Sequence, residues 1–165
     1  MAEAHDRSAR VLDPAYVDAL DASSIEELRV KHAECVELET EVSYVRRLTQ
    51  ARIDILEAEV QRRTSGGSLE DLIARLPEIL SDSGPRGNPA SSRLPLQMAP
   101  EQDSEWAPEL ERFDGVLANL PALSDDELQE AMTGLRTLER DVSAQRRELF
   151  AVIDRIDVSL ATQLR

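Results

Sequence analysis

The sequence predicts an all-α protein, an antiparallel two-helix coiled coil (a helical hairpin) with short extra helices and a disordered connector. Apolar residues recur every seven positions in two long segments, capping signals precede both segments, and a stretch dense in Pro, Gly and Ser separates them. Only 3% of the chain is aromatic, which leaves little bulk for a globular core. Paired helices are therefore the favoured architecture.

The first long helix is expected over residues 23–64, after a flexible N-terminal segment at residues 1–22. Ser24 and Glu27 have the spacing of a capping box, in which each side chain accepts a hydrogen bond from a free N–H at the helix start. The apolar seam of this helix, meaning its heptad positions, consists of Leu28, Cys35, Val42 and Leu56.

The second long helix is expected over residues 122–165. Ser124 and Glu127 repeat the capping box at its start. Its apolar seam consists of Leu128, Leu135, Val142, Leu149 and Ile156. Polar residues interrupt the two seams, and such residues usually mark register selection or a place where the helices part. They are Thr49, Arg52 and Gln145.

Three shorter stretches lie between the long helices. Residues 65–81 have the pattern of a short amphipathic helix, which Pro77 is expected to break or kink. Residues 82–104 have too little apolar content to fold by themselves, so we expect them to be disordered. Residues 105–121 should form a further short helix. A connection of this length is ample to reverse the chain, which favours antiparallel pairing.

Charge and composition restrict the function. The formal net charge of −14 argues against direct nucleic-acid binding, which needs clustered Lys and Arg, and favours a basic protein partner. Cys35 is the single cysteine, so we expect it to pack as a small hydrophobe in a cytoplasmic protein. No apolar run approaches the ~20 residues that span a bilayer, so we expect no membrane association. His5 and His32 are isolated, so we expect no metal site.

A polar pattern occurs twice in this chain, exactly one hundred positions apart in register. The first set is Glu39, Ser43, Arg46, Gln50 and Asp54, and the second set is Glu139, Ser143, Arg146, Phe150 and Asp154. The spacing places each set on one face of a helix, beside the apolar seam. We call the two sets the first and second polar stripes. Their repetition indicates a polar ligand with two equivalent halves.

The residue types alone leave two interpretations of the polar stripes open. Charges beside a coiled-coil seam commonly pair across helices and set their orientation. Alternatively, an Arg fork can bond guanine O6 and N7 or a phosphate, and an Asp can accept from the guanine N1–H and N2–H₂ donors. Guanine plus phosphate, presented twice, describes a cyclic dinucleotide. Phe150 departs from the repeat, and its ring either stacks on a base or ribose or widens the apolar face.

The string Glu-x₃-Ser-x₂-Arg-x₃-Gln-x₃-Asp resembles the repeated cyclic di-GMP signature of the RsiG family of actinobacterial anti-sigma factors. It is complete at residues 39–54 and one residue short at residues 139–154. The resemblance implies a coiled coil that binds a dimer of cyclic di-GMP and, so loaded, holds a sporulation sigma factor of the WhiG type away from RNA polymerase. The ligand-binding residues that it implies are Glu39, Ser43, Arg46, Gln50, Asp54, Glu139, Ser143, Arg146 and Asp154.

The resemblance implies a regulator of transcription and not an enzyme. The stripe carboxylates also lie on a coiled coil, which offers no closed pocket to shift their pKa values. The alternative is a structural or scaffolding coiled coil that binds no small molecule. Because Gln50 can share ligand oxygens and Phe150 cannot, we expect Arg146 to be more critical for ligand than Arg46. Pairing between two chains stays open, since such seams support dimers.

Overall fold

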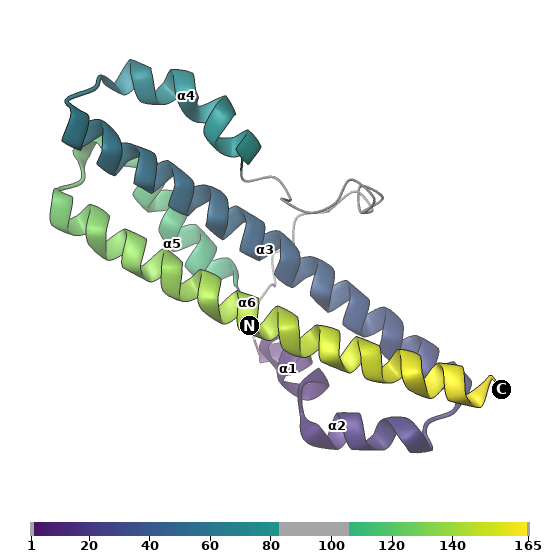
Figure 1. Cartoon of the computed structure of the whole chain (residues 1–165). Coiled ribbons are helices and arrows are strands. Elements are labelled where there is room, and N and C mark those ends of the chain that lie inside the picture. The colour runs from purple at the N-terminus through teal and green to yellow at the C-terminus, as the bar shows by residue number, and fades with distance from the viewer. Residues whose placement is uncertain (1, 83–105, 165) are drawn as a thin grey trace. The chain divides into compact units, whose positions relative to one another are not determined.

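The computed structural model describes residues 2–82 and 106–164, and it confirms the predicted all-α fold class. The elements, shown in Figure 1, are α1 (Ala2–Val11), α2 (Pro14–Asp18), η1 (Ala19–Ala22), α3 (Ile25–Ser65), α4 (Leu69–Asp82), α5 (Ala107–Ala118), η3 (Leu120–Ala122) and α6 (Asp125–Gln163). The segment predicted to be disordered, residues 82–104, lies outside the described residues from residue 83 onward.

The chain divides into two compact units. Among the described residues, unit 1 contains residues 2–44 and 142–164, and unit 2 contains residues 45–82 and 106–141. Both long helices therefore contribute to both units. In each unit the α3 segment packs antiparallel to the α6 segment, as the sequence predicts.

The two long helices begin with the predicted capping boxes. The Ser24 N–H donates to Glu27 Oε2 at 2.7 Å, and the Glu27 N–H donates to Ser24 Oγ at 3.3 Å. The corresponding distances for Ser124 and Glu127 are 2.8 and 3.2 Å. These hydrogen bonds lower the pKa of both glutamates. The helix α3 ends at Gly66, whose φ of 72° is a left-handed conformation that glycine adopts without strain.

The core of unit 1 follows the predicted seam. Cys35 is fully buried within it, as expected for a small hydrophobe. The buried apolar residues that the long helices contribute are Leu28, Cys35, Leu38, Val42, Val142, Leu149, Val152 and Ile156. Heptad spacing in the sequence was sufficient to identify this interface.

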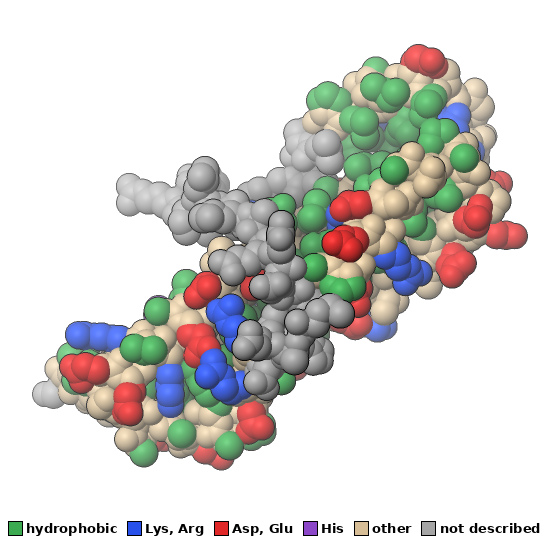
Figure 2. Space-filling model, turned by 180° about the vertical axis from the view of Figure 1, so that it is seen from behind, with side chains coloured by type: hydrophobic (Ala, Val, Ile, Leu, Met, Phe, Trp, Pro, Cys, Tyr) green, Lys and Arg blue, Asp and Glu red, His purple; other side chains and the backbone are tan. Residues whose placement is uncertain are grey.

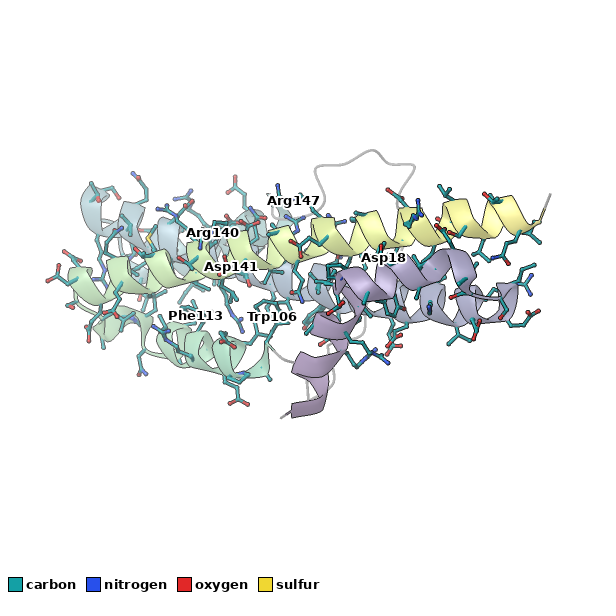
Figure 3. The ribbon with its side chains drawn as sticks, turned by 90° about the horizontal axis from the view of Figure 1, so that it is seen from below. Asp18, Trp106, Phe113, Arg140, Asp141 and Arg147 are labelled. Atoms are coloured by element: carbon teal, nitrogen blue, oxygen red, sulfur yellow. The ribbon has the colours of Figure 1, made fainter. Side chains whose placement is uncertain are left out.

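The core of unit 2 takes residues from shorter elements as well. Its buried apolar residues are Val45, Ile53, Leu56, Leu72, Leu110, Phe113, Leu120, Leu128, Ala131, Met132, Leu135 and Leu138. The Phe113 ring packs on Gly134 of α6, where an added Cβ would lie 3.1 Å from the ring. Figure 3 labels the Phe113 side chain on α5. The short helix predicted over residues 105–121 is present as α5 and η3. Thr49 and Arg52 interrupt the seam and are buried.

The N-terminal segment differs from the expectation of a flexible stretch. Residues 2–22 form α1, α2 and η1, and Val11 and Leu20 are fully buried in unit 1. Arg10 on α1 also forms an ion pair with Glu34 on α3. Burial of the two apolar side chains offsets part of the entropy lost when so short a segment is ordered.

The helix α4 continues through Pro77, so the predicted break does not occur there. A proline inside a helix removes one backbone hydrogen bond. Two features compensate for this loss. The Ser68 N–H donates to Asp71 Oδ2 at 2.8 Å to cap the helix start, and the side chain of Leu72 is buried in unit 2.

Candidate ligand site

In unit 1, residues of both polar stripes meet at Arg146. Its Nε donates to Glu39 Oε1 at 2.9 Å and to Ser43 Oγ at 2.7 Å. The Ser43 hydroxyl in turn donates to Glu39 Oε1 at 2.6 Å. Three residues predicted to bind ligand therefore form one hydrogen-bonded group, with two from α3 and one from α6. We call this group, together with Phe150, the unit 1 half-site.

The unit 1 half-site is partly closed to solvent. Ser43 is 5% exposed, and the side chains of Glu39 and Arg146 are 17% and 34% exposed. The guanidinium of Arg146 lies 4.6 Å from the centroid of the exposed Phe150 ring, which is a cation–π distance. The residue that departs from the repeated pattern thus stacks on the arginine one turn before it in the same helix.

In unit 2, the corresponding group is built around Arg46. Its Nη1 donates to Gln50 Oε1 at 3.4 Å and lies 3.7 Å from Glu139 Oε1, which is an ion pair across to α6. The Nε of Arg46 is buried and has no hydrogen-bond partner within the described part of the chain. We call Arg46, Gln50 and Glu139 the unit 2 half-site. In this group the Nε of the arginine lacks an acceptor among the described residues, whereas in the unit 1 half-site the Nε of the arginine has two.

The two half-sites are related by the repeat in the sequence. Glu39 of α3 pairs with Arg146 of α6 in unit 1, and Glu139 of α6 pairs with Arg46 of α3 in unit 2. Two segments of repeated sequence that pack antiparallel produce this reciprocity. The acid of each stripe therefore faces the arginine of the other stripe.

Three further predicted residues lie on the same two helices. In unit 1, Ser143 is half-buried and Asp154 is exposed. In unit 2, Asp54 is half-buried. All nine predicted residues are thus placed on α3 and α6, and the contacts above bring together six of them. These six are Glu39, Ser43, Arg46, Gln50, Glu139 and Arg146.

Two features of the structure were not foreseen from the sequence. The first is the identity of the paired residues. One interpretation of the stripes had their charges pair across helices, but spacing within one helix does not specify that the acid of each stripe meets the arginine of the other. The second is the role of Arg52, which is 5% exposed and forms an ion pair with Asp114 of α5. A charge in a heptad seam does signal a need for a partner, but the partner is 62 residues away at no characteristic spacing.

Within residues 2–82 and 106–164, no three His, Cys, Asp or Glu side chains are grouped so that they could hold a metal ion. His32 Nε2 lies 3.3 Å from Asp157 Oδ1 in unit 1. No helix in the described ranges combines the length and apolar character of a membrane span.

Comparison with protein families agrees with the resemblance noted from the polar stripes. The family model described as RsiG-like matches residues 14–80. The chain is similar to the RsiG-like family. A search of curated proteins found no match.

The RsiG-like match covers α2, η1, α3 and α4 up to residue 80, and it includes the complete first polar stripe. It spans less than half of the chain and ends before the second stripe. The second stripe is connected to the match through the internal repeat and through its contacts with Glu39 and Arg46. The RsiG-like family is a regulatory one.

Proposed function

We propose that this protein is an anti-sigma factor controlled by cyclic di-GMP, and that the ligand-loaded form holds a sporulation sigma factor of the WhiG type. The proposal depends chiefly on the reciprocal pairing of Glu39 with Arg146 and of Glu139 with Arg46. Each unit therefore presents the same acid–arginine arrangement to a polar ligand. Similarity to the RsiG-like family supports the same function.

The arginines of the half-sites match the acceptors of guanine and phosphate. A guanidinium fork donates two parallel hydrogen bonds to O6 and N7 of guanine, or to two oxygens of a phosphate. The unpartnered Nε–H of Arg46 is especially suited to such a ligand. A buried donor without an acceptor costs ~1–3 kcal/mol, and a ligand oxygen would recover that free energy.

The remaining stripe residues match other groups of the same ligand. Glu39, Asp54, Glu139 and Asp154 can accept from the guanine N1–H and N2–H₂ donors, and Ser43, Gln50 and Ser143 can donate to phosphate or ribose oxygens. A dimer of cyclic di-GMP presents several guanines and phosphates at once.

The proposed protein partner is complementary to this chain in charge. Surfaces of sigma factors that read promoters are basic because they face DNA phosphates, and a chain of formal net charge −14 can occlude them. Figure 2 shows acidic and basic side chains interspersed on one face of the molecule. On that face the complementarity would come from the excess of acidic groups and not from a single acidic patch. Control of a sigma factor would place this function in the cytoplasm.

A structural or scaffolding coiled coil that binds no small molecule is the second candidate function. It is favoured by the closed state of the unit 1 half-site, where Arg146 already donates to Glu39 and Ser43. Charges beside a seam commonly pair in this way to set the orientation of helices. In that case the polar stripes would hold the hairpin together and require no ligand.

Size-exclusion chromatography with a purified WhiG-type sigma factor tests the proposed function. The two proteins are expected to elute as a complex when cyclic di-GMP is present and separately when it is absent. Arg46→Ala should raise the cyclic di-GMP concentration needed for the complex by about tenfold to a hundredfold. Arg136→Ala, which alters an exposed arginine of the same unit outside the stripes, should leave that concentration unchanged. A complex that forms equally with and without ligand would contradict ligand control. Absence of a complex in both conditions would favour the scaffold.

A further inference from the structure

The covalent connection between α3 and α6 cannot set their register. About 60 residues of sequence lie between the end of α3 and the start of α6, and so long a connection restricts axial alignment very little. The seam of α3 is also interrupted by the buried residues Thr49 and Arg52. The Thr49 hydroxyl donates to the Val45 carbonyl of its own helix at 2.8 Å, so this bond fixes no position on α6.

A buried carboxylate lies near the end of α3. Glu59 is fully buried, and both of its oxygens accept hydrogen bonds. Oε2 accepts from Arg62 Nε at 2.7 Å, and Oε1 accepts from Arg62 Nη2 at 2.8 Å and from Arg63 Nε at 2.6 Å. The bonds from Arg62, followed by those from Arg63, lower the pKa of Glu59 and keep it ionised.

Arg63 extends this network to the start of α6. Its Nη1 donates to the Leu123 carbonyl and to Asp125 Oδ1, both at 2.8 Å. Its Nη2 donates to the Leu120 carbonyl at 3.1 Å. Because Glu59 holds the Nε at the same time, the planar guanidinium is bonded on all of its sides. Such a group is fixed in position as well as in charge.

We propose that Glu59 and Arg63 form a register clamp that sets the axial alignment of α3 and α6 in unit 2 and so brings Arg46 opposite Glu139. The predicted effect of the clamp on cyclic di-GMP binding rests on the proposed function, whereas its predicted effect on helix register does not. Buried ion pairs contribute little net stability because desolvation offsets the Coulomb attraction, but register selection is their best-attested role. Bonds from one planar group to two carbonyls are satisfied in a single alignment, whereas apolar seam residues tolerate a shift of one heptad.

Arg63→Met and Arg62→Met form a matched pair of tests. Each variant removes one arginine from Glu59 and leaves the other, so the buried charge keeps a partner in both. Arg63→Met also removes the bonds to residues 120–125, whereas Arg62→Met removes a bond to the Gly67 carbonyl at 2.9 Å. A clamp requires the two variants to differ in register. A network that only stabilises the helix end would make them behave alike.

Register is measured as the distance between spin labels at Gln61→Cys and Gln129→Cys, two exposed positions of unit 2, in a Cys35→Ala background. A slip of one heptad moves the helices by about 10 Å along their axes. Arg62→Met should give the distance distribution of the parent, and Arg63→Met should give a shifted or broader one. A parent distribution in Arg63→Met overturns the clamp, whatever the ligand does.

A control covers the case in which Arg63→Met loses helix content by circular dichroism. Arg63→Lys then replaces it, because lysine keeps the charge but cannot bond Glu59, two carbonyls and Asp125 in one plane. The expected result is again a shifted or broader distance distribution at unchanged helix content. An unchanged distribution in this variant overturns the clamp equally.

Titration with cyclic di-GMP tests whether the register set by the clamp affects ligand binding at the unit 2 half-site. Arg63→Met should bind at least about tenfold more weakly than Arg62→Met, which is the loss expected when one charge-assisted contact is misaligned. If the parent chain does not bind, the proposed function fails and the distance measurement alone judges the clamp. If the parent binds and Arg63→Met changes register without losing affinity, the link between clamp and half-site is overturned.

Discussion

The two half-sites contain the same acid–arginine pair in different states. In unit 1, the Nε of Arg146 donates to both Glu39 and Ser43, and the guanidinium lies over Phe150. In unit 2, the Nε of Arg46 is buried and has no acceptor among the residues that the structure describes. The repeat in the sequence therefore reproduces the spacing of the residues but not the use of their donors.

The difference has a consequence for ligand binding. A ligand that enters the unit 1 half-site must replace hydrogen bonds that Arg146 already makes within the protein. A ligand that enters the unit 2 half-site gives the Nε of Arg46 an acceptor, which it lacks among the described residues. Affinity should therefore depend more on Arg46 than on Arg146. This order is the reverse of the one expected from the Gln50 and Phe150 difference in the sequence.

Arg46→Ala is expected to have the largest effect. A buried charge-assisted bond contributes ~1.5–3 kcal/mol, so the variant should bind cyclic di-GMP about tenfold to a hundredfold more weakly. Isothermal titration measures the loss, and circular dichroism should show unchanged helix content because alanine is the best helix former. Arg136→Ala is the matched control, since it removes an arginine of unit 2 that pairs with Glu57 and lies outside the stripes. Equal affinity in both variants would remove Arg46 from the site.

Arg146→Ala should weaken binding less than Arg46→Ala does. The variant loses a ligand contact, but in the parent that contact replaces existing bonds from Arg146 to Glu39 and Ser43, so its net contribution to affinity is smaller. In the absence of ligand it should lower the free energy of unfolding by ~1 kcal/mol, because the lost bonds are partly exposed. Titration and thermal unfolding measure the two effects separately. A loss of affinity larger than that of Arg46→Ala would restore the order expected from the sequence.

Phe150→Gln completes the second polar stripe and should make the half-sites more alike. The cation–π contact of Arg146, worth ~0.5–1 kcal/mol at an exposed site, disappears, and the guanidinium becomes easier to redirect. Affinity for cyclic di-GMP is expected to rise by a few-fold. Phe150→Leu serves as the control, because it removes the ring without supplying an amide. A lower affinity in Phe150→Gln would indicate that the ring itself contacts the ligand.

The smallest effect concerns unit 2 away from its half-site. Because the pKa of Glu59 is lowered in the folded state, its stabilising contribution is present above the unfolded pKa and is lost as pH falls through the folded pKa. Glu59→Gln should therefore reduce the fall in Tm between about pH 5 and pH 3. Glu27 and Glu127 are present in both proteins, so the difference between the two curves isolates Glu59. Identical slopes would show that the carboxylate is not selectively stabilised by folding.

The long helices were predictable because their determinants are local. The capping boxes of Ser24 and Ser124 place the starts of α3 and α6 at the following residue, and heptad spacing identifies the buried side chains. The positions of the stripe residues on one helix face follow from the same periodicity. Such features depend on neighbours within one turn of helix, which a sequence specifies directly.

The remaining features depend on partners that are distant in sequence. Burial of Val11 and Leu20 orders the N-terminal helices, although their local composition resembles a flexible segment. Arg63 meets carbonyls about 60 residues away, and no spacing within a helix encodes that contact. The unequal bonding of Arg46 and Arg146 likewise requires the register of the pair. Residue types and periodicity identify the candidate site residues, whereas tertiary contacts determine which hydrogen bonds those residues form.

Isothermal titration of the parent chain with cyclic di-GMP, with cyclic di-AMP as comparison, tests the central claim most directly. Guanine presents the O6 acceptor to an arginine fork where adenine presents an amino donor. The half-sites should therefore bind cyclic di-GMP with micromolar or tighter affinity and cyclic di-AMP far more weakly. Absence of binding up to millimolar cyclic di-GMP, or equal binding of the two dinucleotides, would contradict the assignment of the polar stripes as a guanine-reading site.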